Sequence, residues 1–262
     1  MGEATVLALR VGSQRTTASR SYYRHASYGE PDVEQTLDFY FWLVRTPTHT
    51  MLVDTGFSER GTAHRAGVEW LIDAREAVIA VGVDPDEITH IIVTHLHYDH
   101  VGNLHQFPSA RLLIQRREIE FWNSWYAAYP PLASTVEPEE LAYIRERIAA
   151  GTVDVLDGSV ELAPGISVIE VGGHTPGQQV VVVEGSRPIV LASDALHFYE
   201  EMDRDLAFNV YSDIADLYQA LATFREMRRN GAVIVAGHDP AVMTMFETVC
   251  SVDGVALAVQ IR

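Results

Sequence analysis

Runs of apolar residues, separated by stretches of helical periodicity, predict a mixed α/β fold for this chain. Runs of about four to eight residues that are rich in β-branched side chains predict strands buried on at least one face. These runs cover residues 5–11, 37–44, 49–53, 90–94, 111–115, 166–171, 179–183, 189–192 and 233–237. Several runs are followed at once by histidine or aspartate, so polar side chains are expected at strand ends.

The intervals between the strands carry apolar residues at helical spacing. A glycine stands after each of the three clearest stretches, where it favours the end of a helix. We expect helices over residues 68–79, 138–150 and 214–230. Groups of strands therefore alternate with helices in both halves of the chain, which predicts two sheets sandwiched between helices.

Two further segments carry structural predictions. Asp84-Pro85-Asp86-Glu87 combines an N-cap, a proline in the first turn and early acids, which predicts a short helix. Residues 13–35 form a polar loop that is long for a compact domain, so we expect it to be functional or mobile. Its Tyr22 and Tyr28 either line a substrate pocket or pack against the domain, since aromatic side chains bury large areas in both settings.

A second aromatic stretch begins at residue 118. Phe121, Trp122 and Trp125 either pack into the core or form a lid whose apolar contacts hold a substrate, because ligand pockets are mostly apolar. We treat residues 1–262 as one domain and keep a lid insertion at about 118–150 as one of these two interpretations.

Four side chains able to bind a metal ion occupy one stretch of six residues, His95-Leu96-His97-Tyr98-Asp99-His100. The stretch follows an apolar run directly, which places it at the C-terminal end of a buried strand. His95 and His97 share one side of an extended or turning backbone, so their imidazoles can converge on one ion. Asp99 and His100 lie beyond the turn and can reach a second ion nearby.

A site with two metal ions needs more ligands than one loop supplies, and later strand ends offer them. His174, Asp194 and His238 each follow a strand-like run. Glycines beside the two histidines let the backbone approach closely. The sequence thus predicts a metal centre assembled from four separate segments.

These motifs together resemble the metallo-β-lactamase fold superfamily, and within it the N-acyl-homoserine lactonase branch. The resemblance lies in the order His-x-His-x-Asp-His, Gly-His-Thr-Pro-Gly, an aspartate closing a strand, and Gly-His-Asp. Val53-Asp54-Thr55-Gly56 is similar to the early strand-to-turn motif of the superfamily. The order and approximate spacing cover nearly the whole chain, which implies an α/β fold of the four-layer αββα sandwich type.

The resemblance also implies a ligand set for two metal ions. His95, His97 and His174 would bind one ion, Asp99, His100 and His238 the other, and Asp194 would bridge them. Nitrogen and carboxylate ligands point to Zn²⁺ first, although Co²⁺, Mn²⁺ or Fe²⁺ suit the same set. Asp54 is expected to hydrogen-bond a ligand histidine, to stabilise the Asp-Thr-Gly turn, or to do both.

Such a centre predicts hydrolysis without a serine or cysteine nucleophile. Two divalent ions about 3.5–4 Å apart share a water and lower its pKa toward 7, so the metal-bridging hydroxide attacks the substrate at neutral pH. One ion also polarises the carbonyl under attack. The lactonase resemblance gives Asp99 the role of carrying the proton to the leaving alkoxide.

The chain departs from the lactonase pattern just after Asp194. The branch places a tyrosine three residues after the bridging aspartate, where it orients or polarises the substrate carbonyl. Here that position is His197, and Tyr199 follows two residues later. Either His197 donates the same hydrogen bond, or Tyr199 reaches into the site, or the substrate is not a homoserine lactone.

Charge and composition narrow the function. The chain has 19 basic and 36 acidic residues and a net charge of −17, which argues against nucleic acid or an anionic membrane as a partner. Cys250 is the only cysteine, so no internal disulfide is possible. No apolar run approaches the roughly 20 residues of a membrane span, and a signal-peptide pattern is missing, so we expect a cytoplasmic protein. A homodimer is compatible with the sequence.

We therefore predict a dinuclear metal-dependent hydrolase that opens a lactone ring, with an N-acyl-homoserine lactone, and hence quorum quenching, as the first candidate. The alternative is another ester, thioester or amide hydrolase on the same scaffold, such as a glyoxalase II-like or small-molecule catabolic enzyme. A glutathione thioester calls for a cationic patch that the acidic C-terminal half does not offer. True β-lactamases generally lack counterparts of Asp194 and His100.

Overall fold

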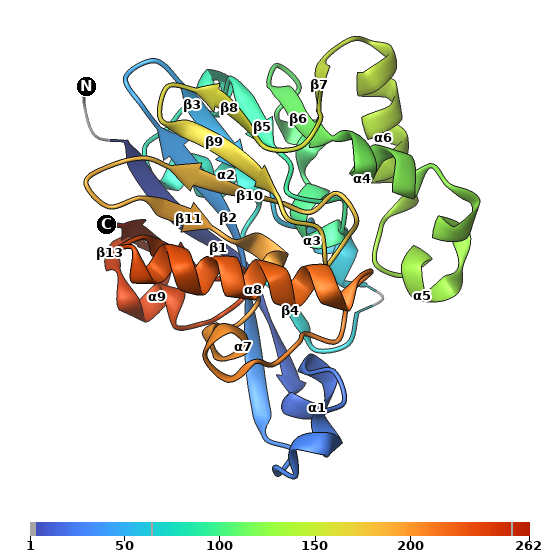
Figure 1. The fold of residues 1–262 in the computed structure, drawn as a ribbon. Coiled ribbons are helices and arrows are strands. Elements are labelled where there is room, and N and C mark those ends of the chain that lie inside the picture. Colours follow the sequence, from blue (N-terminus) through green and yellow to red (C-terminus); the bar gives the residue numbers. More distant parts are fainter. Residues whose placement is uncertain (1–3, 64, 253) are drawn as a thin grey trace.

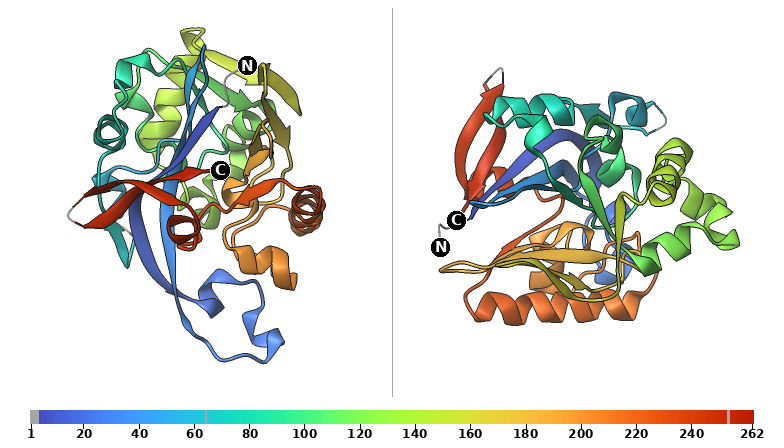
Figure 2. Two further views of the ribbon diagram at one scale, coloured as in Figure 1. Left: turned by 90° about the vertical axis from the view of Figure 1, so that its left-hand side faces the viewer. Right: turned by 90° about the horizontal axis from the view of Figure 1, so that it is seen from above.

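The computed structural model describes residues 4–63, 65–252 and 254–262, and it contains two β-sheets packed face to face (Figure 1). Helix α2 (Ala74–Ala80) covers the outer face of one sheet, and helix α8 (Ile214–Arg229) covers the outer face of the other. The view from above in Figure 2 shows the resulting order of layers: helix, sheet, sheet, helix. The αββα sandwich expected from the sequence is confirmed.

The large sheet contains nine strands of the described chain. Along the sheet they follow the order β13 (Glu247–Val252), β14 (Val255–Ile261), β1 (Thr5–Thr17), β2 (Glu34–Arg45), β3 (Thr50–Val53), β5 (His90–Ile92), β6 (Arg111–Gln115) and β7 (Val153–Leu156), while β4 (Val68–Trp70) pairs with β1. Strands β3, β5, β6 and β7 are parallel neighbours. Their carboxyl ends therefore meet at one edge, which carries the loop with His95 and His97.

The small sheet contains five strands of the described chain. Their order is β12 (Val233–Val235), β11 (Ile189–Leu191), β10 (Gln179–Val183), β9 (Ile166–Glu170) and β8 (Val160–Ala163). Strands β11 and β12 are parallel, and β9 to β11 are antiparallel. Parallel pairing brings the ends of β11 and β12 together, and these ends lead into Asp194 and His238.

The remaining helices are short, apart from α6. They are α1 (Ala18–Ser21), α3 (Tyr98–Val101), α4 (Arg116–Trp122), α5 (Pro130–Ala133), α6 (Pro138–Ala149), α7 (Tyr199–Arg204) and α9 (Val242–Met245). Single 3₁₀ turns lie at His25–Tyr28, Glu59–Thr62, Pro85–Glu87, Leu104–Gln106, Trp125–Ala128 and Ser193–Ala195. Within the described chain, no helix is both long and apolar enough to cross a membrane.

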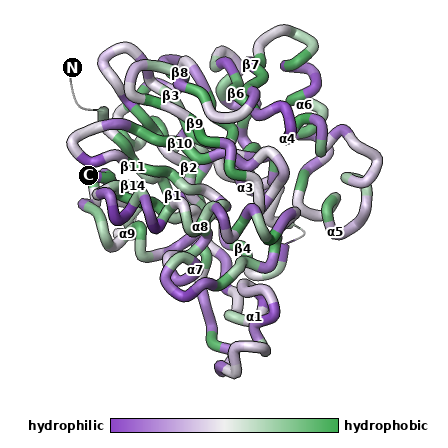
Figure 3. Tube along the Cα trace, viewed as in Figure 1, coloured by the Kyte–Doolittle hydropathy of each residue, from purple (hydrophilic) through white to green (hydrophobic). Residues whose placement is uncertain are grey.

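Strands β1 and β2 are buried on both faces, which explains their continuous apolar sequence. Val6 and Trp42 point into the core between the two sheets. Leu7 and Phe41, their neighbours in sequence, point into a second core beneath α2 and α6. Figure 3 shows hydrophobic positions gathered on the central strands. Each fully buried side chain of this size contributes about 1.5–3 kcal/mol, so the sheets form a rigid base for the loops at their edge.

The helix predicted over residues 68–79 is wrong in its first half. Val68–Trp70 forms strand β4, which pairs with β1. The helix begins only after Asp73, whose side chain accepts a hydrogen bond from Arg75 N at 3.0 Å. The apolar residues happened to fit a helical period, but strand pairing with a distant part of the chain supplies the backbone hydrogen bonds of β4.

The long polar loop predicted over residues 13–35 is wrong at both ends, and only residues 18–33 connect the two strands. Strand β1 continues to Thr17 and β2 begins at Glu34, so both strands extend beyond the body of the molecule (Figure 1). We call residues 12–36 the hairpin arm. Its strands carry polar residues because they project into solvent, and pairing of their backbones holds them extended without an apolar face.

Predictions that depend on local capping signals are confirmed. The side chain of Asp84 accepts a hydrogen bond from Asp86 N and starts the short 3₁₀ turn Pro85–Glu87. Helices α6 and α8 fill the two other ranges predicted as helices. Local hydrogen bonds and amphipathic periodicity were sufficient there because no distant strand competes for the backbone.

Candidate metal centre

The structure brings the seven expected ligand residues together at the edge where the two sheets meet. Ligand atoms of His95, His97, His174 and Asp194 lie within 4.8 Å of one another, and so do those of Asp99, His100 and His238. Each of these residues is at most 8 % exposed. Two groups of ligand atoms, rather than one, are therefore buried side by side.

Asp194 stands between the two groups. Its Oδ1 lies 3.1 Å from His100 Nε2 and 3.0 Å from His238 Nε2. Its Oδ2 lies 3.2 Å from His174 Nε2 and 3.8 Å from His95 Nε2. One carboxylate thus presents one oxygen to each group, which is the arrangement of a bridging ligand.

The donor atoms fit two divalent cations. His95 Nε2 is buried and has no hydrogen-bond partner in the described part of the chain, so its lone pair is free for a cation. Burial lowers the pKa of His95 and His174 well below the ordinary value, and it lowers the pKa of His97 to about 4. These imidazoles are therefore neutral, which is the form that binds metal ions.

Asp54 orients one of these histidines from behind. Its Oδ2 accepts a hydrogen bond from His100 Nδ1 at 2.7 Å, which turns His100 Nε2 toward Asp194. Asp54 also accepts hydrogen bonds from the backbone and the hydroxyl of Thr94, at 2.8 and 2.7 Å. Its backbone has φ 62°, a left-handed conformation that costs a non-glycine residue energy and that these three buried hydrogen bonds offset.

Backbone carbonyls orient two further histidines. His174 Nδ1 donates to Val210 O at 2.9 Å, and His238 Nδ1 donates to Asp38 O at 2.9 Å. Each hydrogen bond fixes the tautomer and leaves the Nε2 lone pair directed at Asp194. Asp38 lies on β2 and Val210 follows α7, so the large sheet and the segment after α7 both support the cluster.

Glu118, which the sequence did not indicate, ties two ligand loops together. Its Oε1 accepts from Leu96 N at 3.0 Å and from Trp122 Nε1 at 2.7 Å, while its Oε2 accepts from Gly177 N at 3.0 Å. Burial raises the pKa of Glu118, and these hydrogen bonds act against that shift. A Cβ on Gly177 would lie 2.3 Å from Glu118 N, so only glycine permits this close approach.

His197 lies in the site, next to Asp194. Its Nε2 is 3.2 Å from Asp194 Oδ2, and its ring stacks on Phe208 with 3.6 Å between centroids. Burial acts to lower the pKa of His197, but the Asp194 and Glu201 carboxylates raise it by more, so that the net pKa is about 9. In the absence of cations this imidazole is therefore a cationic hydrogen-bond donor.

Tyr199 does not reach the site. Its hydroxyl donates to Ile234 O at 3.1 Å, on the edge strand β12, and its backbone N–H donates to Asp239 Oδ2. Tyr199 is the first residue of α7, whose helical turn carries its side chain away from Asp194. Of the two replacements considered for the expected tyrosine, only His197 lies beside Asp194.

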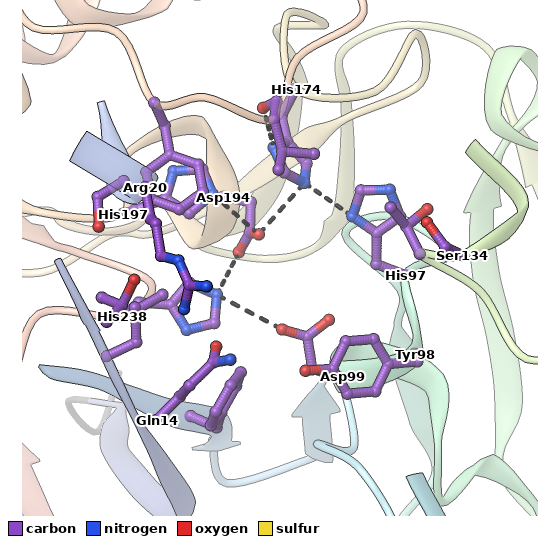
Figure 4. Close-up of a pocket in the computed structure, with 17 residues that line it drawn as sticks. Gln14, Arg20, His97, Tyr98, Asp99, Ser134, His174, Asp194, His197 and His238 are labelled. Atoms are coloured by element: carbon purple, nitrogen blue, oxygen red, sulfur yellow. Dashed lines mark hydrogen bonds and ion pairs between the residues drawn. The ribbon is translucent and has the colours of Figure 1, made fainter. Parts of the chain in front are cut away.

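A cavity of about 230 Å³ opens beside the cluster (Figure 4). The ligands on its wall are His97, Asp99, His174, Asp194 and His238. The other wall residues are Gln14, Thr16, Arg20, Ser21, Leu37, Phe39, Tyr98, Ser134, Thr135, His197, Phe208 and Val210. Most of the latter come from the hairpin arm and from loops, where neither periodicity nor a motif marks a binding residue, so the sequence revealed only His197 among them.

The aromatic residues proposed for the substrate pocket lie elsewhere. Tyr22 is buried and its hydroxyl donates a hydrogen bond to Glu200 Oε2 in α7. This contact anchors the hairpin arm to α7. Tyr28 lines a separate cavity behind that anchor.

The remaining aromatic residues of that proposal belong to the segment that begins at α4. Trp122 is buried beneath His97, with 5.7 Å between ring centroids, and Phe121 packs edge-on against Trp122. Trp125 is 77 % exposed. Packing around Glu118 draws the first part of this aromatic stretch into the core instead of over the cavity.

Comparison with known proteins agrees with this geometry. A model of the metallo-beta-lactamase superfamily matches residues 40–238, a range that contains both groups of ligand atoms. A Bacillus protein named N-acyl homoserine lactonase is 26% identical over 227 residues, which cover 78% of this chain and 83% of that protein.

Solved structures share the fold over almost the whole chain. A crystal structure of a quorum-quenching N-acyl homoserine lactone lactonase has a TM-score of 0.74 and 22% identity, and the match covers 97% of this chain and 98% of that one. AidC, a dizinc quorum-quenching lactonase in complex with a product, has a TM-score of 0.71 and 21% identity, with 92% and 89% covered.

Proposed function

The chain belongs to the metallo-beta-lactamase superfamily, and on this premise we propose that it is a dinuclear metal-dependent hydrolase that opens a lactone ring. The observation that carries the proposal is Asp194, whose two oxygens face two separate groups of buried ligands. The relative named N-acyl homoserine lactonase and the dizinc lactonase with the same fold support the reaction class and favour zinc.

The residues of this chain divide the work of binding two cations. His95, His97 and His174 would hold one ion, Asp99, His100 and His238 would hold the other, and Asp194 would serve both. When bound, the two cations lower the pKa of water and polarise the carbonyl of the substrate. Asp54, Glu118 and the carbonyls behind His174 and His238 keep the ligands in place.

In this proposal Asp99 moves the proton during ring opening. Its Oδ2 is 3.7 Å from His100 Nε2 and 3.8 Å from His238 Nε2, and the side chain lies on the cavity wall. The Asp99 carboxylate accepts the proton of the attacking water and delivers it to the ring oxygen as the C–O bond breaks. The product is a hydroxy acid.

His197 takes the place of the tyrosine found in the lactonase branch. Stacking on Phe208 fixes its ring, and Nε2 faces the cavity beside Asp194. An N–H at this point donates a hydrogen bond to the substrate carbonyl and holds it for attack. Hydrolysis of an open-chain ester, thioester or amide uses the same groups and is the alternative activity.

A substrate panel tests the proposal. Protein loaded with two zinc ions per chain, as measured by atomic emission, is assayed by pH-stat titration against lactones with short and long acyl tails, open-chain esters and thioesters. We expect acid release from lactones at rates well above those from the open-chain esters. Full metal occupancy with no ring opening of any lactone would refute the lactonase proposal, and ester turnover in the same panel would favour the alternative.

The cytoplasmic location, the homodimer and the role in quorum quenching remain proposals from the sequence and the relatives' names. Cell fractionation, analytical ultracentrifugation and degradation of acyl-homoserine lactone signals in culture would test them in turn.

A further inference from the structure

Arg20 is a cation without a partner on the wall of the cavity (Figure 4). The chain has no lysine, so all 19 of its basic side chains are arginine. Most of these arginines form ion pairs, as Arg10 does with Asp38 and Arg111 with Asp154. Among the described residues, the guanidinium of Arg20 has no hydrogen bond, no ion pair and no contact with an aromatic ring. A guanidinium that faces a substrate cavity without a protein partner is available to a ligand.

The backbone around Arg20 is held firmly. The N–H and the hydroxyl of Ser19 both donate to the Asp32 carboxylate at 2.8 Å. Ser21 O accepts a hydrogen bond from Asn209 N at 2.7 Å, which ties the hairpin arm to the loop beside the cavity. Residues 19 and 21 are therefore fixed on both sides of Arg20. Such placement reduces the entropy lost when the side chain binds a ligand.

The charges of the site do not require Arg20. Asp54, Asp99 and Asp194 face histidines of the cluster, and within the described chain none of these carboxylates forms an ion pair with Arg20. An arginine that neutralised them would have to lie within ion-pair distance of at least one. The unpaired guanidinium thus fits recognition of a ligand and does not fit neutralisation of the ligand set.

The surroundings of Arg20 are polar as well. Thr16 and Arg20 line both the catalytic cavity and a second cavity of about 550 Å³ along the hairpin arm. Glu34 and Arg15 also line this second cavity, and the side chain of Arg15 has no hydrogen bond or ion pair in the described chain. A route of this kind favours a short polar or charged substituent over a long apolar acyl tail.

We infer that the substrate is a lactone that carries a carboxylate or another anionic group, and that Arg20 binds this group. The inference rests on the proposed lactonase function and specifies its substrate class. A planar guanidinium forms two parallel hydrogen bonds with a carboxylate, which selects both the charge and the orientation of the ring. Arg20 is thereby a specificity-determining residue, and it takes no part in breaking the ester bond.

The test compares three lactones that differ in one ring substituent. They are 5-oxotetrahydrofuran-2-carboxylate, which is anionic, γ-valerolactone, which is neutral, and a γ-butyrolactone bearing a trimethylammonium group. The wild type is expected to prefer the anion. Arg20→Ala lowers the ratio of kcat/KM for the anionic to the neutral lactone by roughly ten- to a hundredfold, mainly through KM, as loss of a charge-assisted hydrogen bond predicts.

Two further variants separate charge from structure. Arg20→Lys retains part of the preference, and Arg20→Glu reverses it in favour of the cationic lactone. Arg229→Ala is the matched control. Arg229 is also exposed, and its side chain has no hydrogen bond or ion pair within the described chain, but it lies at the end of α8, away from the cavity. It is expected to leave all three rates unchanged.

Several outcomes would overturn the inference. The first is a wild type without preference for the anionic lactone. The second is an equal loss of kcat/KM on all three lactones in Arg20→Ala, since that result would assign Arg20 to the product carboxylate or to folding. If the zinc-loaded wild type opens no lactone, the proposed function fails. The anion-binding role of Arg20 is then tested by calorimetric titration with 2-hydroxyglutarate. The affinity of the protein for this anion must fall in Arg20→Ala, and an unchanged affinity would overturn the inference.

Discussion

The metal cluster and the hairpin arm meet at the same cavity, but they are built in opposite ways. The cluster is buried, and backbone carbonyls or buried carboxylates orient its histidines. The arm is polar and largely exposed, and distant contacts such as the Tyr22–Phe208 bridge fix its position. Under the proposed function and the inference for Arg20, the buried part carries out the reaction and the arm selects the substrate. Changes in the cluster should affect every substrate, whereas changes in the arm should affect selected ones.

The largest effect should come from the bridging position. Asp194→Asn removes the negative charge that faces both groups of ligands, so we expect the loss of at least one ion per chain and of activity on the order of a thousandfold or more on every substrate. Atomic emission and kcat/KM on two unlike lactones measure both effects. Stripping the wild type with a chelator should reproduce the loss, and zinc should restore it. If metal-free protein turned over substrate at the original rate, the buried cluster would not be the site of the reaction.

A smaller uniform loss should follow from Asp54→Asn. The amide retains the shape of the side chain but removes the charge that accepts the hydrogen bond of His100 Nδ1. We expect metal affinity and activity to fall by roughly ten- to a hundredfold, as is usual for residues that orient a ligand histidine. Titration with zinc measures the affinity, and excess zinc should recover part of the activity. Asp157→Asn, which alters an exposed ion pair, is the control. Metal affinity equal to that of the control would show that Asp54 acts only on its turn.

Sequence reasoning found the cluster because its signals are local. Six consecutive residues supply four ligands, and each later ligand stands three or four residues after the end of an apolar strand. The same reasoning missed Glu118, whose partner Gly177 lies 59 residues away, because nothing near Glu118 marks it as an acceptor. Strand β4 and the outer hairpin arm were missed for the same reason: pairing with distant strands stabilises them, and their own side chains do not. Reaction class was thus readable from local pattern, while the cavity wall depends on long-range packing.

Glu118→Gln tests a link of this long-range kind. The amide can accept from Leu96 N and Trp122 Nε1, but its NH₂ group faces the N–H of Gly177, so a buried donor loses its acceptor. We expect the free energy of unfolding to fall by about 1–3 kcal/mol. Activity should fall less than in Asp54→Asn. Urea unfolding monitored by tryptophan fluorescence gives the stability, and Glu120→Gln, an exposed residue of the same helix, is the control. Equal stability of the two variants would remove Glu118 from the support of the cluster.

The smallest effect should come from Trp125, where the lid interpretation of residues 118–150 can be tested directly. The side chain is 77 % exposed and packs only against Tyr126 and Tyr129 among the rings of the described chain. If the hairpin arm selects the substrate, Trp125→Ala should change the unfolding free energy by less than about 0.5 kcal/mol. It should then affect hexanoyl- and decanoyl-homoserine lactone equally. A loss confined to the decanoyl substrate would instead show that an aromatic lid holds apolar tails. A lid of that kind selects for a long acyl chain, whereas Arg20 selects for an anion. The ratio of the decanoyl to the hexanoyl rate in Trp125→Ala therefore shows which side of the cavity determines substrate specificity.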